Sequence, residues 1–129
     1  MAVAHSRPDL AAHTKAVRAS FPELVTELRA LLGARLVAYL GSVRETRAVR
    51  QWADGEREPS DEVRNRLRVA LQVALTLAAA ESPDIAQAWF QGLNPQLEDR
   101  SPARLLREGE LAEVGPSVIA PARAFLTSG

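Results

Sequence analysis

The sequence predicts an all-α protein, in which a helix-turn-helix bundle is followed by a smaller helical C-terminal module. Apolar residues recur at the three- and four-residue spacing of helices, and no stretch alternates apolar and polar residues long enough to build a sheet. Ser82-Pro83 and Ser101-Pro102 each combine a helix N-cap with proline at the first helical position. Because 47% of the 129 residues are hydrophobic, the chain can also bury a core.

Three parts are expected along the chain: a flexible N-terminal tail, a helix-turn-helix domain and a C-terminal module, at residues 1–19, 20–80 and 81–129. The tail shows no sustained periodicity and contains Pro8, so we expect at most one weak helical turn there. It also holds both histidines, His5 and His13, which are expected to be solvated rather than to bind a metal.

The first helix of the domain is expected to begin at Phe21, because Ser20 and Glu23 have the spacing of a capping box. The apolar stripe of this helix consists of Leu24, Leu28, Leu31 and Leu32. Gly33 is expected to end the helix, since glycine is common at helix C-termini.

A helix-turn-helix unit is expected next, with helices over 34–40 and 45–53 joined by a tight turn. Gly41 closes the first helix and is expected to supply the positive φ that a sharp turn requires. Val49 and Trp52 fall on the inner face of the second helix, so we expect Trp52 to anchor that helix from behind.

A long helix is expected from Asp61 to Ala80, capped by Ser60 and led by two acidic residues that suit a helix N-terminus. From Val69 onward this helix is apolar over most of its circumference. Such a helix must be covered on two sides. The N-terminal bundle is expected to cover one side, and either the C-terminal module or a second copy of the chain the other.

Two helices, at residues 83–91 and 102–108, are expected to open the C-terminal module. A last helical region follows over 111–126. We expect it to be kinked or broken at Gly115-Pro116 and at Pro121, because proline removes a backbone hydrogen bond from a helix interior.

The zero net charge of the chain hides a difference between its two halves. Lys and Arg outnumber Asp and Glu by 12 to 9 over residues 1–80, whereas they are fewer, by 4 to 7, over residues 81–129. A mildly basic first half suits a polyanion, and an acidic second half suits a basic protein surface.

Several function classes are disfavoured by what the sequence lacks. There is no cysteine, which excludes disulfides and thiolate metal sites. The longest apolar run, Val69 to Ala80, is too short to span a bilayer, and the N-terminus lacks the apolar core of a signal peptide, so we expect a cytoplasmic protein. No phosphate-binding loop, metalloprotease motif or nucleophile elbow is present. We therefore expect neither an enzyme nor a cofactor.

The helix-turn-helix unit carries a candidate DNA-binding surface. Its exposed face is expected to present Arg44, Thr46, Arg47 and Arg50. Arginine suits phosphates and guanine edges, and Thr46 at the start of a helix can hold a phosphate. The alternative is a purely structural hairpin with surface arginines. Because a single module buries little surface, a DNA-binding chain of this kind is expected to act as a dimer on paired half-sites.

The C-terminal module resembles a known family. The residues in question are Trp89, Asn94-Pro95, Leu97, Ser101-Pro102, Leu105-Leu106 and Gly109. Their order is similar to that in the toxin-binding domain of the Xre/MbcA/ParS-type antitoxins. The helix-turn-helix unit lies where this family has its Xre-like half, so the resemblance covers about residues 25–127.

The resemblance implies an antitoxin of a type II toxin-antitoxin system, whose partner is a cognate RES-domain toxin that degrades NAD. Such antitoxins occlude the active site of the toxin with their C-terminal region and repress their own operon as a complex, which makes operator DNA a second partner. The toxin-binding residues expected here are Glu110, Glu113, Ile119, Arg123, Phe125 and Leu126. The acidic ones would meet toxin arginines, with Glu108 beside them, and the apolar ones would lie at the pocket mouth.

Alternatives remain for the C-terminal end and for the function of the whole chain. Phe125 and Leu126 could fold back onto the long helix instead of contacting a partner. The whole chain could also be a stand-alone transcriptional regulator, whose C-terminal half only dimerises or senses a small ligand, or a structural adaptor that binds no DNA.

Overall fold

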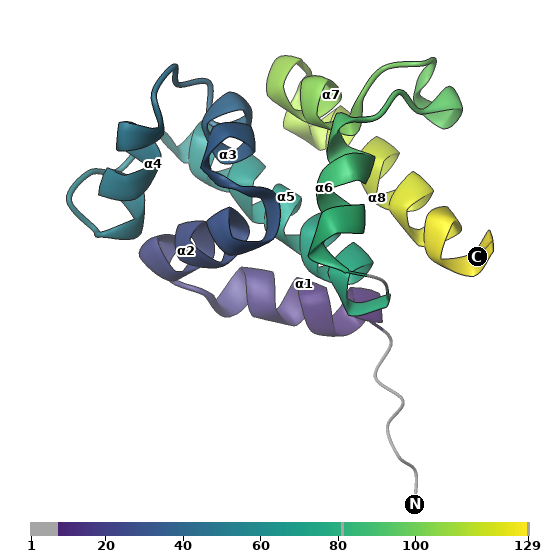
Figure 1. The fold of residues 1–129 in the computed structure, drawn as a ribbon, viewed down its shortest axis with the longest axis horizontal. Coiled ribbons are helices and arrows are strands. Elements are labelled where there is room, and N and C mark those ends of the chain that lie inside the picture. Colours follow the sequence, from purple (N-terminus) through teal and green to yellow (C-terminus); the bar gives the residue numbers. More distant parts are fainter. Residues whose placement is uncertain (1–7, 81, 129) are drawn as a thin grey trace, which may run out of the picture.

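The computed structural model describes residues 8–80 and 82–128 (Figure 1). Within these residues the chain forms α-helices, one short 3-10 helix and no strand, which confirms the predicted all-α class. The helices are α1 (Pro8–Arg18), α2 (Phe21–Leu32), α3 (Ala34–Leu40), α4 (Thr46–Ala53), α5 (Asp61–Ala80), α6 (Pro83–Gln91), the 3-10 helix η1 (Pro95–Leu97), α7 (Pro102–Glu108) and α8 (Leu111–Ser128).

Helix α5 is the centre of the fold. It contacts α1 and α2 from the N-terminal part and α6 and α8 from the C-terminal part (Figure 1). Its fully buried side chains include Leu67, Leu71 and Leu77. Burial of each such leucine contributes about 1.5–3 kcal/mol. The expectation of two-sided cover is therefore confirmed, and the C-terminal module supplies the second side. The expected division between residues 80 and 81 stays a prediction.

Residues 8–18 form helix α1, so the prediction of a flexible tail over 1–19 is wrong for this segment. The helix packs against α5 and buries Ala12 and Ala16. Alanine buries little surface, which is why the sequence shows no clear apolar stripe here. Residues 1–7, with His5, lie outside the described part of the chain.

An arginine on α5 holds the end of α1. Nη1 of Arg68 donates to the carbonyl oxygens of Ala16 at 2.6 Å and of Ala19 at 3.2 Å. The last carbonyls of a helix have no partner within it, and a cation also suits their negative dipole end. This contact joins residues about fifty positions apart, so no local pattern predicts it.

The capping box at the start of α2 is confirmed. The Ser20 backbone N–H donates to Oε1 of Glu23 at 3.2 Å, and the Glu23 backbone N–H donates to Oγ of Ser20 at 3.4 Å. Hydrogen bonds from the Ser20 side chain and backbone lower the pKa of the Glu23 carboxyl. The entry into the domain is thus fixed by its own local sequence.

The turn between α3 and α4 differs from the prediction in its backbone. Gly41 has φ −83°, and the left-handed residue is Ser42, at φ +59°. Glycine is needed at position 41 for a different reason. A Cβ there would lie 2.7 Å from Cη2 of Trp52, a side chain that faces inward and is buried, as predicted. The indole therefore packs directly on the peptide backbone.

A buried guanidinium holds this turn in place. Nη1 of Arg66, on α5, donates to the carbonyl oxygen of Leu40 at 3.0 Å and to Oγ of Ser42 at 3.1 Å. Nη2 donates to Oε1 of Glu62 at 3.2 Å. The whole residue is 6% exposed. Arg66 thus caps the C-terminus of α3 and fixes the left-handed residue after it.

The start signals of the C-terminal module are confirmed. Oγ of Ser82 accepts from the backbone N–H of Ile85 at 3.3 Å, and Oγ of Ser101 accepts from that of Arg104 at 3.1 Å. Asn94 caps η1 in the same way, because Oδ1 accepts from the Gln96 N–H at 2.9 Å. These caps set where each short helix begins.

Helix α8 runs from Leu111 to Ser128 without interruption, so the expectation of a break at Gly115-Pro116 or at Pro121 is wrong, and a kink at these positions stays a prediction. Each proline removes one backbone hydrogen bond, but the helix is held by its packing on α5 and α7. Its buried side includes Val118, fully buried, and Ala122, 1% exposed. Tertiary contacts here outweigh the local preference of proline.

Replacing Arg66 with alanine should lower the free energy of unfolding by about 2–3 kcal/mol, because hydrogen bonds from a charged donor to buried acceptors are lost. The control is Arg64→Ala on the same helix, whose partners Asp61 and Glu58 are exposed. That change should lower the free energy of unfolding by less than about 1 kcal/mol. Urea unfolding followed by circular dichroism measures both, and equal losses would contradict the role given to Arg66.

Candidate functional site

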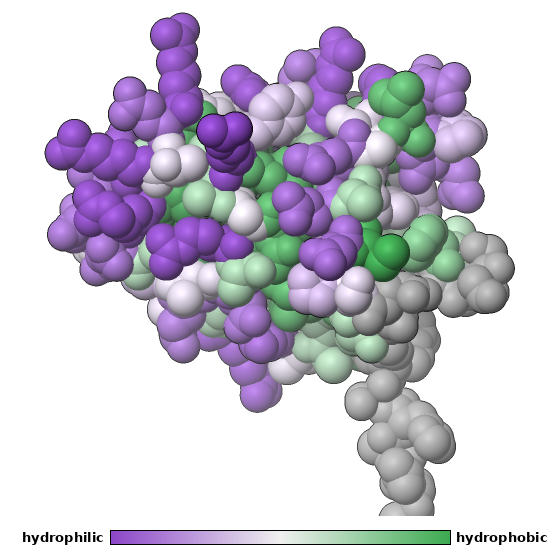
Figure 2. All heavy atoms as spheres, in the orientation of Figure 1, coloured by the Kyte–Doolittle hydropathy of each residue, from purple (hydrophilic) through white to green (hydrophobic). Residues whose placement is uncertain are grey.

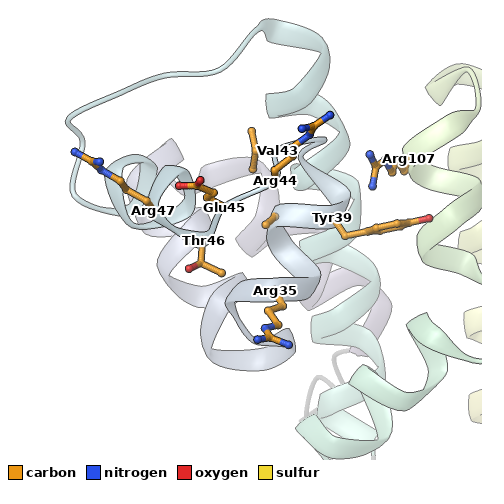
Figure 3. Close-up of a pocket in the computed structure, with 9 residues that line it drawn as sticks. Arg35, Tyr39, Val43, Arg44, Glu45, Thr46, Arg47 and Arg107 are labelled. Carbon is orange, nitrogen blue, oxygen red and sulfur yellow. The ribbon is translucent and has the colours of Figure 1, made fainter.

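A groove opens between the helix-turn-helix unit and the C-terminal module (Figure 3). It is formed by α3, by the turn and first residues of α4, and by α7 across from them, and its volume is about 730 Å³. The lining residues are Arg35, Ala38, Tyr39, Val43, Arg44, Glu45, Thr46, Arg47 and Arg107. Figure 2 shows that hydrophilic side chains cover the α4 end of this face of the molecule.

The groove carries positive charge that the protein itself does not neutralise. Four arginines line it, together with a single acidic residue, Glu45. Within residues 8–80 and 82–128, none of these four forms an ion pair. A cluster of unpaired guanidinium groups attracts anions and presents donors arranged for phosphate or carboxylate oxygens.

One side of the groove is closed by a cation–π contact. Cζ of Arg107, on α7, lies 4.4 Å from the centroid of the Tyr39 ring on α3 (Figure 3). Both side chains are half-buried, and α3 and α7 pack against each other. Contacts of this kind contribute about 0.5–1 kcal/mol at partly exposed sites. The contact links the helix-turn-helix unit to the C-terminal module.

Three of the four residues predicted for DNA binding lie together at this groove. Arg44, Thr46 and Arg47 are exposed around the start of α4, and Arg47 points away from the protein in Figure 3. Arg44 and Arg47 also border a second hollow, of about 440 Å³. The turn and the start of α4 therefore lie between two depressions, and both Arg44 and Arg47 are exposed there.

The fourth predicted residue, Arg50, does not line either hollow. It is exposed one turn further along α4, and Nη1 lies 3.4 Å from Oδ2 of Asp54 and 3.9 Å from Oε2 of Glu56. These two exposed carboxylates offset part of its charge. Arg50 is thus less available to an external anion than Arg47.

Sequence reasoning did not predict that Arg35, Tyr39 and Arg107 belong to this groove. Arg35 and Tyr39 are four positions apart on α3 and so share one face of that helix, a signal that the sequence does contain. Arg107 is far away in the sequence. Only the packing of α7 on α3 brings it to the groove, so no local signal predicts it.

The residues predicted to bind a toxin do not form one patch. Glu110 and Glu113 lie at the start of α8, where they are exposed and suit the positive end of the helix dipole. Phe125 is 37% exposed near the other end. Glu113 and Phe125 are twelve positions apart, which corresponds to about 18 Å along the helix axis.

The remaining predicted residues of α8 differ in exposure. Ile119 is half-buried and packs against the core, and Arg123 is exposed beside it. Both line a narrow crevice against α5 with Gln72 and Thr76. The side chain of Leu126 lies outside the described residues. Near the described C-terminal end of α8, Arg123 and Phe125 are therefore the exposed members of the predicted set.

The potential metal ligands of the described residues are scattered. No three potential metal ligands lie close enough together to hold an ion. None of the helices there combines the length and apolarity that crossing a bilayer requires.

Known proteins give one informative match. No protein-family model matches the sequence, and no curated protein matches it significantly. Among solved structures, the fold is similar to that of a chain in the crystal structure of the M. tuberculosis MbcT-MbcA toxin-antitoxin complex, with a TM-score of 0.63 and 29% sequence identity. The match covers 82% of this chain and 96% of that chain. It bears out the resemblance predicted from the sequence and supports the identification of the chain as an MbcA-like antitoxin.

Proposed function

We propose that this chain is an antitoxin that binds a cognate NAD-degrading RES-domain toxin and occludes its active site. It also binds the operator DNA of its own operon through α3 and α4. The observation that carries the antitoxin role is the match over 96% of a chain from a toxin-antitoxin complex. The observation that supports the DNA role is the groove of unpaired arginines beside α4.

Neutralisation by this chain is steric and requires no catalysis. The exposed end of α8 presents an apolar ring, Phe125, next to a cation, Arg123. An aromatic side chain that enters a pocket buries a large apolar surface and displaces substrate. Glu113 lies about 18 Å from Phe125 along α8, and Glu110 lies just before the helix, so both would meet basic residues elsewhere on the toxin.

The way in which α4 is held supports the proposed DNA binding. Trp52 is buried behind the helix, and its ring packs against Phe21 with the centroids 6.2 Å apart. Arg44, Thr46 and Arg47 then face outward at the start of the helix, the part of a recognition helix that reaches base edges and phosphates. Two copies would place two such helices on paired half-sites. A chain with this partner acts in the cytoplasm.

Replacing Phe125 with aspartate should abolish protection against the toxin, because a charge cannot enter an apolar pocket without a large desolvation cost. The assay is co-expression with the product of the neighbouring gene, with growth and cellular NAD as readouts. Point changes are preferable to truncation from residue 117, which would also remove the buried Val118 and Ala122.

The matched control is Leu93→Asp, which introduces the same charge at an apolar residue that is 75% exposed before η1. Protection by this control should equal that of the wild type. Full protection by Phe125→Asp would contradict the occlusion mechanism. Failure of the wild-type chain to copurify with the neighbouring product would instead favour a stand-alone regulator.

Replacing Arg47 with alanine should weaken binding to duplex DNA from upstream of the operon by about 1–3 kcal/mol, because a direct contact is lost. Arg50→Ala serves as the comparison. This change should weaken DNA binding clearly less, since Arg50 already forms ion pairs with Asp54 and Glu56. Fluorescence anisotropy at fixed salt measures both, and an unchanged affinity for Arg47→Ala would argue against α4 as the recognition helix.

A further inference from the structure

We infer that the C-terminal module contributes a residue to the DNA interface: Arg107 on α7, held over the ring of Tyr39, binds a backbone phosphate beside the recognition helix. This inference rests on the proposed DNA-binding function and extends it beyond the helix-turn-helix unit. The position of Arg107 in the arginine-lined groove carries it.

Arg107 differs from Arg104, its neighbour on the same helix, in its ion pairing. Nε of Arg104 donates to Oε1 of Glu108 at 3.2 Å, so that charge is paired. Arg107 has no carboxylate partner within residues 8–80 and 82–128, although it is half-buried. A half-buried guanidinium without a counter-ion leaves donors available for an external anion.

The contact with Tyr39 orients this guanidinium. Cζ lies 4.4 Å from the ring centroid, so the ring covers one side of the side chain and restricts its rotamers. Ordering a long side chain before a ligand arrives lowers the entropy lost on binding. Arg107 is therefore prearranged for an anion in the groove.

The arrangement of the groove fits the phosphates of a duplex. In a helix-turn-helix protein the second helix enters the major groove, while the first helix crosses the DNA backbone. Arg35 and Tyr39 lie one turn apart on α3, the first helix, and Arg107 continues the wall beyond them. Arg44, in the turn, and Arg47, on α4, line the same groove. One polyanion can contact the whole series of arginines.

The experiment measures how the affinity for DNA changes with salt, using the full chain. The probes are a 40-base-pair duplex from immediately upstream of the operon and a scrambled duplex of the same length. Loss of one phosphate contact reduces the slope of log affinity against log salt by about 0.9. Arg107→Ala should show this reduction and bind roughly fivefold more weakly to both probes, because a phosphate contact is independent of sequence.

The matched control is Arg104→Ala, which removes the same charge three residues away, outside the groove. Its slope should equal that of the wild type. Arg107→Lys keeps the charge and should restore the slope, whereas Arg107→Gln keeps a long side chain without the charge and should show the same loss of slope as Arg107→Ala. Circular dichroism confirms that the variants keep their helices.

The outcomes separate this inference from the proposed function. If the wild type binds DNA, Arg47→Ala weakens it and Arg107→Ala matches Arg104→Ala, the inference is overturned while the helix-turn-helix role stands. Equal slope losses for Arg104→Ala and Arg107→Ala would also overturn it, because the loss would then come from the lower net charge of the protein and not from one phosphate contact. If the wild type binds neither duplex, the DNA role itself fails.

Discussion

The arrangement of the site depends on one buried side chain, Arg66. Its guanidinium reaches from the central helix α5 to the end of α3 and to Ser42, the left-handed residue of the turn. The position of α4 relative to α3 is set at that turn. Without a cap on the last carbonyls of α3, the helix would fray, and Arg44 and Arg47 would lose the positions that the turn and α4 give them. Arg68, two positions later, holds α1 in the same way.

Because α5 is shared, the two proposed interfaces are parts of one packed body. Helices α6 and α8 lie on the same central helix as α1 and α2, and a single hydrophobic core includes side chains from all of them. The basic groove lies where α7 meets α3, whereas the exposed end of α8 is on a different part of the surface (Figure 1). One molecule can therefore present separate surfaces to a nucleic acid and to a protein.

The sequence predicts well what is determined locally. Four serines accept a backbone hydrogen bond at a helix start, and the local sequence predicts each of these caps: Ser20, Ser60, Ser82 and Ser101. For features that depend on distant contacts, the prediction was wrong or no prediction was made. Helix α1 buries alanines and is held by Arg68, and α8 continues through two prolines because the core supports it. The site follows the same rule, since Arg44 and Arg47 are local to the turn whereas Arg107 comes from packing.

The contact between Gly41 and Trp52 has a consequence for how such chains diverge. The indole ring leaves no room for a Cβ at position 41, and it is fixed because it is fully enclosed. A larger residue at position 41 is acceptable only if the aromatic residue shrinks at the same time. Among homologues, we would therefore look for the two positions to change as a pair, with intermediates that carry only one of the two changes being rare.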